Sequence, residues 1–164
     1  MKGTEMTVIA AWPGTGKTTA GKLEGVIDLE SSDYKWLDAK PNRDKEAAKG
    51  CLHVPNPSFP ANYVDAVLAE HRRGKIVLTS MHAGVLDLIE QSTPVISVVP
   101  HREDRDLYLA RYEQRGNPPA MIEHMRTHWD DYLNQASTRS CVVTIEPDQY
   151  LTDILTAQNY LAQK

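Results

Sequence analysis

The sequence predicts an α/β domain in which a parallel β-sheet is covered on both faces by helices. Short runs rich in Val, Ile and Thr alternate along the chain with longer segments of helical spacing, which is the pattern of a doubly wound sheet. Within the runs the apolar residues are consecutive rather than alternating, as in strands that are buried on both faces. The chain has 164 residues, of which 41% are hydrophobic, and this suits a single domain over residues 1–164.

Five runs predict the strands, because each is rich in β-branched residues and is followed by polar or turn-forming ones. In chain order they are Thr7 to Ala11, Val26 to Leu29, Lys75 to Ser80, Pro94 to Val99 and Cys141 to Glu146. The segments that lie between and after them have the spacing of helices: Thr18 to Leu23, Tyr63 to Arg73, Ala83 to Glu90, Arg105 to Arg115, Ala120 to Asn134 and Tyr150 to Ala162.

Charge and cysteine content limit the possible partners. Eighteen basic and 22 acidic residues give a net charge of -4, so any site for a polyanion has to be local. No apolar run approaches the length of a membrane span, about 18 residues, so we expect a cytoplasmic protein with no membrane partner. Cys51 and Cys141 are far apart in the chain, and we expect both to be reduced core thiols. The oligomeric state stays open.

The loop after the first predicted strand matches the Walker A pattern for binding nucleotide phosphates, with Ala11 in place of the first glycine. Its glycines let backbone N–H groups converge on phosphates, Lys17 reaches the β and γ oxygens, and the Thr18 hydroxyl binds magnesium. The sequence therefore predicts ATP and Mg²⁺ as cofactors. The residues expected to bind them are Pro13, Gly14, Thr15, Gly16, Lys17, Thr18 and Thr19.

With this motif in place, almost the whole chain resembles the P-loop kinases of the nucleoside-monophosphate-kinase type. The resemblance implies a three-layer P-loop fold with strand order 2-3-1-4-5. The chain has no Asn-Lys-x-Asp sequence for reading guanine, which disfavours a GTPase. The strand Lys75 to Ser80 has no acidic residue at its end, unlike the corresponding strand of ATP-driven motors.

Two acidic residues lie at the end of the second predicted strand. Small-metabolite kinases similar to shikimate kinase carry an Asp-x-Asp there, and this chain has Asp28 and Glu30. The resemblance implies that Asp28 binds magnesium together with Thr18, and that Glu30 holds the acceptor hydroxyl for in-line transfer. Alternatively, these acids belong to a helix-capping cluster with Ser31 and its neighbours.

Residues 101–119 resemble the lid region of the same kinases. Arg111 and Arg115 are four residues apart on one helical face, so both are predicted to contact the transferring phosphoryl group as catalytic residues, alongside Lys17. Arg102 and Arg105 are predicted to contact substrate. The alternative is a solvated helix whose arginines form salt bridges with neighbouring acids.

Residues 33–62 form a long insertion, which we expect to bind the acceptor. Its aromatic and amide side chains suit the recognition of a base. The candidate substrate residues in and next to it are Ser31, Trp36, Asn56 and Phe59. Alternatively, Trp36 and Phe59 anchor the loop to the core. His82 follows the third strand at the edge where such sheets bind ligands, and it is a further candidate.

Four segments together resemble a group of phage-associated P-loop kinases: Trp12 to Thr18, Asp28 to Tyr34, Asn56 to Tyr63 and Arg111 to Asn117. This resemblance implies transfer of phosphate to the 5-hydroxymethyl group of 5-hydroxymethyluracil in DNA, and a location in the host cytoplasm. A free nucleotide or nucleoside kinase is the alternative, although Arg43 is the only arginine in the insertion that could bind an acceptor phosphate. A non-catalytic ATP-binding regulator is a third hypothesis.

Overall fold

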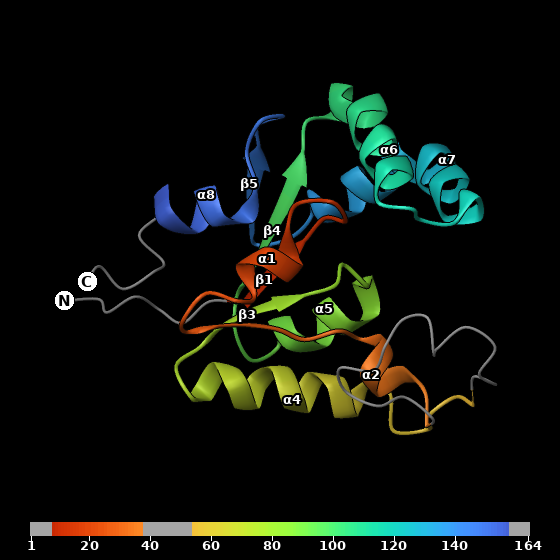
Figure 1. Cartoon of the computed structure of the whole chain (residues 1–164). Helices are drawn as coiled ribbons and strands as arrows, with labels where there is room; N and C mark the ends of the chain where they lie inside the picture. Colours follow the sequence, from red (N-terminus) through yellow and green to blue (C-terminus); the bar gives the residue numbers. More distant parts are fainter. Residues whose placement is uncertain (1–7, 38–53, 158–164) are drawn as a thin grey trace.

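The computed structural model describes residues 8–37 and 54–157. Its centre is a five-stranded parallel sheet in the order β2-β3-β1-β4-β5, which confirms the predicted fold class and strand order (Figure 1). The strands are β1 (Val8–Ala11), β2 (Val26–Asp28), β3 (Ile76–Thr79), β4 (Val95–Pro100) and β5 (Cys141–Ile145). Thr7, which the sequence assigns to the first strand, lies outside the described residues.

β1 occupies the middle of the sheet. Ile9 lies opposite Leu78 of β3 on one side and Ile96 of β4 on the other. Along the chain, β2 and β3 are added on one side of β1, and β4 and β5 on the other. Open α/β sheets bind ligands in the crevice at the carboxyl ends of the strands where the strand order reverses in this way. The loop with the Walker A pattern begins at this point.

Helices cover both faces of the sheet. One face carries α1 (Lys17–Ala20) and α8 (Leu151–Ala157), and the other carries α4 (Ala61–Arg72) and α5 (Ala83–Glu90). Side chains of β1 alternate between the layers, since Ile9 packs in the cluster with α1 and α8 whereas Val8 packs with α4 and α5. The uninterrupted apolar runs of the strands follow from this two-sided burial.

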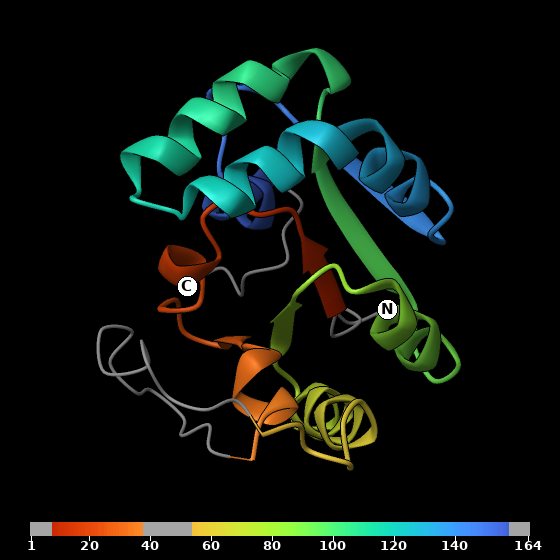
Figure 2. The same ribbon diagram turned by 90° about the vertical axis from the view of Figure 1, so that its right-hand side faces the viewer.

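A third apolar cluster joins the loop after β1 to two further helices, α6 (Arg105–Gln114) and α7 (Pro119–Ala136). Figures 1 and 2 show the two helices side by side, preceded by the short 3₁₀ helix η1 (Arg102–Asp104). Trp12, Tyr108 and Trp129 are buried together at this junction, and the two indole rings meet edge to face at 5.1 Å. The Arg-rich helix is thus packed into the core along one side.

The structure corrects two expectations. The helix predicted over Thr18 to Leu23 ends at Ala20, because Gly21 packs against Asp28 of β2 and the chain continues in tight turns. Cys141 is exposed rather than in the core, because β5 is an edge strand of which only Ile145 is fully buried. Cys51 lies outside the described residues.

The predicted insertion is described only at its two ends. α2 (Ser32–Lys35) follows β2, and an antiparallel bridge then pairs Trp36 with Pro55. Residues 38–53 lie outside the described part, so the acceptor-binding role predicted for 33–62 stays a prediction. Within residues 8–37 and 54–157, no helix has the length and apolar character needed to span a membrane.

Candidate active site

The loop between β1 and α1 requires glycine at two positions. Gly14 and Gly16 have φ values of 87° and 94°, in the left-handed region that other residues rarely adopt. A Cβ atom on Gly14 would lie 3.0 Å from the ring of Tyr112, and one on Gly16 would lie 3.3 Å from the ring of Tyr150. The two aromatic rings therefore pack directly against the backbone of the loop.

Hydrogen bonds hold this loop from behind. The buried Thr15 hydroxyl donates to the carbonyl oxygen of Trp12 at 2.6 Å, and the Tyr112 hydroxyl donates to that of Pro13 at 2.8 Å. The Leu151 N–H donates to the carbonyl oxygen of Thr15 at 2.8 Å. Since its carbonyl oxygens bond to the protein, the loop is preorganised before any ligand binds. Thr15 itself acts as a structural residue of the turn.

A pocket of about 520 Å³ lies over the loop. Its lining includes most of the residues that the sequence predicts for phosphate transfer. The lining residues are Pro13, Gly14, Gly16, Lys17, Thr18, Thr19, Glu30, Arg111, Gln114, Arg115 and Tyr150. The structure thus brings the loop, one acid and both predicted arginines to one cavity, although they are spread over more than 100 residues of sequence.

Arg111 is held between two tyrosine rings. Its guanidinium lies 4.6 Å from the centre of the Tyr108 ring and 4.8 Å from that of Tyr150. It also donates to the carbonyl oxygens of Gly14, at 3.3 Å, and Pro147, at 2.5 Å. Arg111 therefore connects α6, the loop and the segment after β5. Arg115, one turn later, is exposed at the same pocket.

The two acids at the end of β2, Asp28 within it and Glu30 beyond it, differ in position. Asp28 is half-buried beside Gly21, and it does not line the pocket, whereas Glu30 is exposed and does. Between them, the carbonyl oxygen of Leu29 accepts a hydrogen bond from Tyr63 at 2.6 Å. Burial, with a smaller contribution from the charges of Asp28 and Glu30, raises the pKa of Tyr63, so its hydroxyl stays a donor. The hydrogen bond anchors the backbone that presents Glu30.

Magnesium binding by Asp28 together with Thr18 stays a prediction. Among the described residues, no group of three or more His, Cys, Asp and Glu side chains is arranged to hold a metal ion by itself. Magnesium in kinases is usually bound by one or two protein ligands together with substrate phosphates, so the Thr18 hydroxyl at the pocket and the nearby carboxylates suit it.

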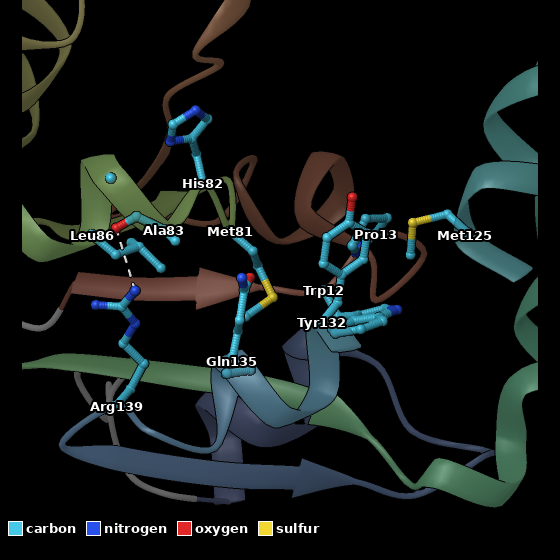
Figure 3. A pocket seen from close by; sticks show the side chains of 12 residues that line it. Trp12, Pro13, Met81, His82, Ala83, Leu86, Met125, Tyr132, Gln135 and Arg139 are labelled. Atoms are coloured by element: carbon cyan, nitrogen blue, oxygen red, sulfur yellow. Dashed lines mark hydrogen bonds between the residues drawn. The ribbon is translucent and has the colours of Figure 1, made fainter. Parts of the chain in front are cut away.

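A second pocket, of about 370 Å³, lies between the amino end of α5 and α7 (Figure 3). Trp12 and Pro13 of the loop form one wall, and Pro13 lines both pockets. The rest of its wall comes from Met81 to Gly84, Leu86, Met125, Tyr132, Gln135, Ala136 and Arg139. Most of its surface is apolar.

The predicted substrate residues of the insertion have structural contacts. Asn56 accepts a hydrogen bond from the Ser58 N–H at 2.9 Å, and its own N–H donates to Lys35. Phe59 packs against the rings of Tyr63 and His82 and extends the core between the sheet and α4. Ser31 precedes α2 and Trp36 ends it. These contacts favour the anchoring interpretation for Phe59.

The other predicted substrate residues lie apart from the loop pocket. The His82 ring accepts a hydrogen bond from the Val85 N–H and caps α5. Arg102 pairs with Asp130 at 2.7 Å, Arg105 approaches Asp106 at 3.4 Å, and both line a separate small cavity near Trp129. Contacts of these arginines with substrate stay a prediction.

A search of protein-family models finds no match to this chain, and a search of curated proteins finds none either. The residues of the site and their geometry are therefore the basis for assigning a function.

Four contributors to the described site were not among the predicted residues, and one of them, Gln114 at the end of α6, lines the loop pocket. Tyr108 and Tyr112 are four residues apart on α6, a spacing that could have indicated a shared aromatic face. Burial raises the pKa of both tyrosines, so both stay neutral beside the loop. Tyr150 carries no such signal, because its contact with Gly16 arises only when α8 packs beside α1.

Proposed function

We propose that this chain is an ATP-dependent phosphotransferase whose acceptor is a hydroxyl group. The observation that carries the proposal is the pocket in which Lys17, Thr18 and Glu30 meet Arg111 and Arg115 over a glycine loop. Converging cations and backbone N–H groups suit a polyphosphate, and a carboxylate among them suits a hydroxyl nucleophile. An apolar or zwitterionic ligand would use few of these groups.

The loop fits a bound nucleotide. The left-handed conformation of Gly14 and Gly16 turns the loop backbone in the way that lets N–H groups converge on phosphate oxygens. Lys17 and Thr18 are the residues that hold the phosphates and magnesium, with Asp28 nearby. ATP, as substrate, supplies the γ-phosphoryl group, and magnesium offsets charge on the phosphate oxygens.

The chain's own residues then position the acceptor and stabilise charge. Glu30 accepts a hydrogen bond from the acceptor hydroxyl and takes its proton as the new oxygen–phosphorus bond forms, while the bond to the β–γ bridging oxygen breaks and ADP leaves. Arg115 and Lys17 stabilise the charge on the transferring group, and Arg111 keeps the loop and lid together. Removing one such charge-stabilising group costs about 10²–10³ in rate.

The most specific acceptor we propose is the 5-hydroxymethyl group of 5-hydroxymethyluracil in DNA. The support is the resemblance of four separate segments to kinases of that kind, together with the carboxylate of Glu30 in the pocket over the loop. DNA binding by an acidic protein requires a local basic surface. The exposed Arg115 is one contributor.

The test is transfer of labelled γ-phosphate from ATP with magnesium to four acceptors: nucleoside monophosphates, nucleosides, plain DNA and DNA containing 5-hydroxymethyluracil. Lys17→Ala should lower the transfer rate by at least about 100-fold, because its charge acts on the phosphates. Lys22→Ala is the matched control, since Lys22 is exposed and lies outside the pocket. Its rate should equal that of the unmodified chain.

Label in the modified DNA alone would support the full proposal. Label in a free nucleotide would replace the DNA acceptor with a metabolic one. Tight ATP binding without transfer to any acceptor would contradict the enzyme and favour a regulator.

A further inference from the structure

The pocket between α5 and α7 borders the loop, and Pro13 is the only predicted nucleotide-binding residue in its described lining. Its volume of about 370 Å³ is at the small end of the range for small-molecule sites, which is about 300–1,000 Å³. Trp12, Met81, Leu86 and Met125 give it apolar walls. Such a lining suits the faces of a planar ring, since aromatic and thioether side chains pack well on π-systems.

The charged and titratable side chains of this pocket already have partners. The Arg139 guanidinium, which is 8% exposed, donates to Asp87 at 2.6 Å and Glu90 at 2.7 Å. Its other nitrogen donates to the Ala83 carbonyl oxygen, the contact drawn as a dashed line in Figure 3. The pocket therefore offers no free cation to an acceptor phosphate, and an uncharged occupant fits it best.

The remaining titratable residues of the lining are also engaged. The His82 ring caps α5, and in Figure 3 it points away from the other side chains of the pocket. The Tyr132 hydroxyl is hydrogen-bonded to the His124 ring, so the pocket meets the ring carbons of Tyr132.

Two polar side chains of the lining remain available: the buried Trp12 indole N–H, which has no hydrogen-bond partner among the described residues, and the Gln135 amide. In residues 8–37 and 54–157 the Gln135 amide makes no hydrogen bond to another side chain or to the backbone, although it lines the pocket. Figure 3 shows Gln135 and Met81 projecting into the same space from α7 and from the end of β3. A glutamine amide offers a donor and an acceptor side by side, which matches a ring whose edge carries both.

We infer that this pocket holds the uncharged ring of the acceptor, a pyrimidine base, with Gln135 bonded to its polar edge. The inference rests on the proposed function and assigns the acceptor to a different place from the insertion at 33–62. Since Pro13 lines both pockets, a base held here lies next to the phosphate loop. A base in DNA reaches such a pocket only outside the stack, so single-stranded DNA is the better ligand.

The experiment measures equilibrium binding, without ATP, of two single-stranded oligonucleotides that differ at one position: 5-hydroxymethyluracil in one and an abasic site in the other. The whole chain should bind the base-containing strand about tenfold more tightly, the order of magnitude of one stacked base. Gln135→Leu, which keeps the side-chain size, should lower that ratio several-fold, because it removes the hydrogen bonds to the polar edge of the base and leaves the apolar walls in place. Gln91→Leu, at an exposed position beyond the end of α5, should keep the ratio.

Each outcome decides the inference independently of catalysis. Equal binding of both strands by the unmodified chain would overturn it, and so would a ratio that Gln135→Leu leaves unchanged. A base preference that depends on Gln135 supports it even where no phosphate is transferred, in which case the proposed function alone fails. Phosphate transfer without any base preference would leave the kinase standing with another hydroxyl acceptor, and this inference would be wrong.

Discussion

Gly21 allows α1, which follows the loop after β1, to pack closely against the end of β2 that carries Asp28. Its backbone is in the ordinary right-handed region, yet a Cβ atom would lie 2.7 Å from the Cβ of Asp28 and 3.2 Å from the Lys17 carbonyl oxygen. Neither neighbour is the free end of a flexible side chain. Glycine is required at position 21 because Asp28 and the Lys17 carbonyl lie too close for a Cβ atom, and not because of its φ angle. Gly14 and Gly16 differ, since both have positive φ values.

We therefore expect Gly21→Ala to lower the free energy of unfolding by about 1–3 kcal/mol, the usual cost of overpacking. It should also reduce phosphate transfer by displacing Asp28. Gly84→Ala in α5 is the control, because its added Cβ would meet the His82 ring at an ordinary 3.4 Å and alanine favours a helix. Urea unfolding of both variants measures the difference in their unfolding free energies. Equal values for Gly21→Ala and Gly84→Ala would show that α1 can move away from β2 at no cost in stability.

At the scale of elements, Arg139 joins α5 to the segment that leads into β5. Glu90 also accepts a hydrogen bond from the Ser140 hydroxyl at 2.5 Å. Burial disfavours ionisation of Glu90, but the bonds from Arg139 and Ser140 outweigh it and lower the pKa of Glu90 below its ordinary 4.5. A carboxyl with a lowered pKa in the folded state stabilises the fold above its unfolded pKa, and that contribution is lost as the pH falls through the lowered value.

Arg139→Leu should therefore cost about 1–3 kcal/mol of unfolding free energy at pH 7, because it leaves the mostly buried Glu90 without its charged partner. The loss should shrink as the pH falls below 4.5, where Glu90 is protonated in the unfolded chain. Arg126→Leu breaks an exposed pair with Glu123 and should cost less than about 1 kcal/mol. Denaturant unfolding at several pH values tests this prediction. If Arg139→Leu lowered the unfolding free energy by the same amount at every pH, the ion pair between Arg139 and Glu90 would not be the cause of the loss.

At the scale of the whole molecule, the loop between β1 and α1 connects α8 to the packed pair α6 and α7. Its carbonyl oxygens bond to α6 and to α8, and Trp12 extends the cluster that includes α7. A ligand that binds the loop in the folded state therefore stabilises every element that packs on it, and mass action links that binding to unfolding.

ATP with magnesium at about 100 times its dissociation constant should add about 2.7 kcal/mol to the unfolding free energy. For a chain of this size, that corresponds to a rise in Tm of about 5–10 °C. Lys17→Ala should unfold at the original temperature without ligand and show little rise with it, whereas Lys22→Ala should respond like the unmodified chain. Calorimetry would contradict the loop assignment if ATP raised the Tm of Lys17→Ala by the full amount.

The order of strands and helices and the place of the glycine turn between β1 and α1 were predictable because they depend on local properties. Consecutive β-branched residues specify a strand buried on both faces, and helical spacing specifies α5 with the bounds Ala83–Glu90. Gly14 and Gly16 follow from the backbone that a phosphate loop needs. Local patterns could not indicate that α1 ends at Ala20, because Gly21 meets Asp28 only when α1 packs across β2.

The sequence by itself determined the fold class, the strand order implied by its resemblance, and the loop from Pro13 to Thr19. Only the tertiary structure decided which side chains share a cavity: it brings Glu30 and Arg115 to the loop, encloses Arg111 between two tyrosines, and places Gln135 in a pocket whose arginine is already neutralised. The physical reason is that backbone preferences act between near neighbours. Pocket walls and ion pairs instead join residues tens of positions apart, and only packing specifies those.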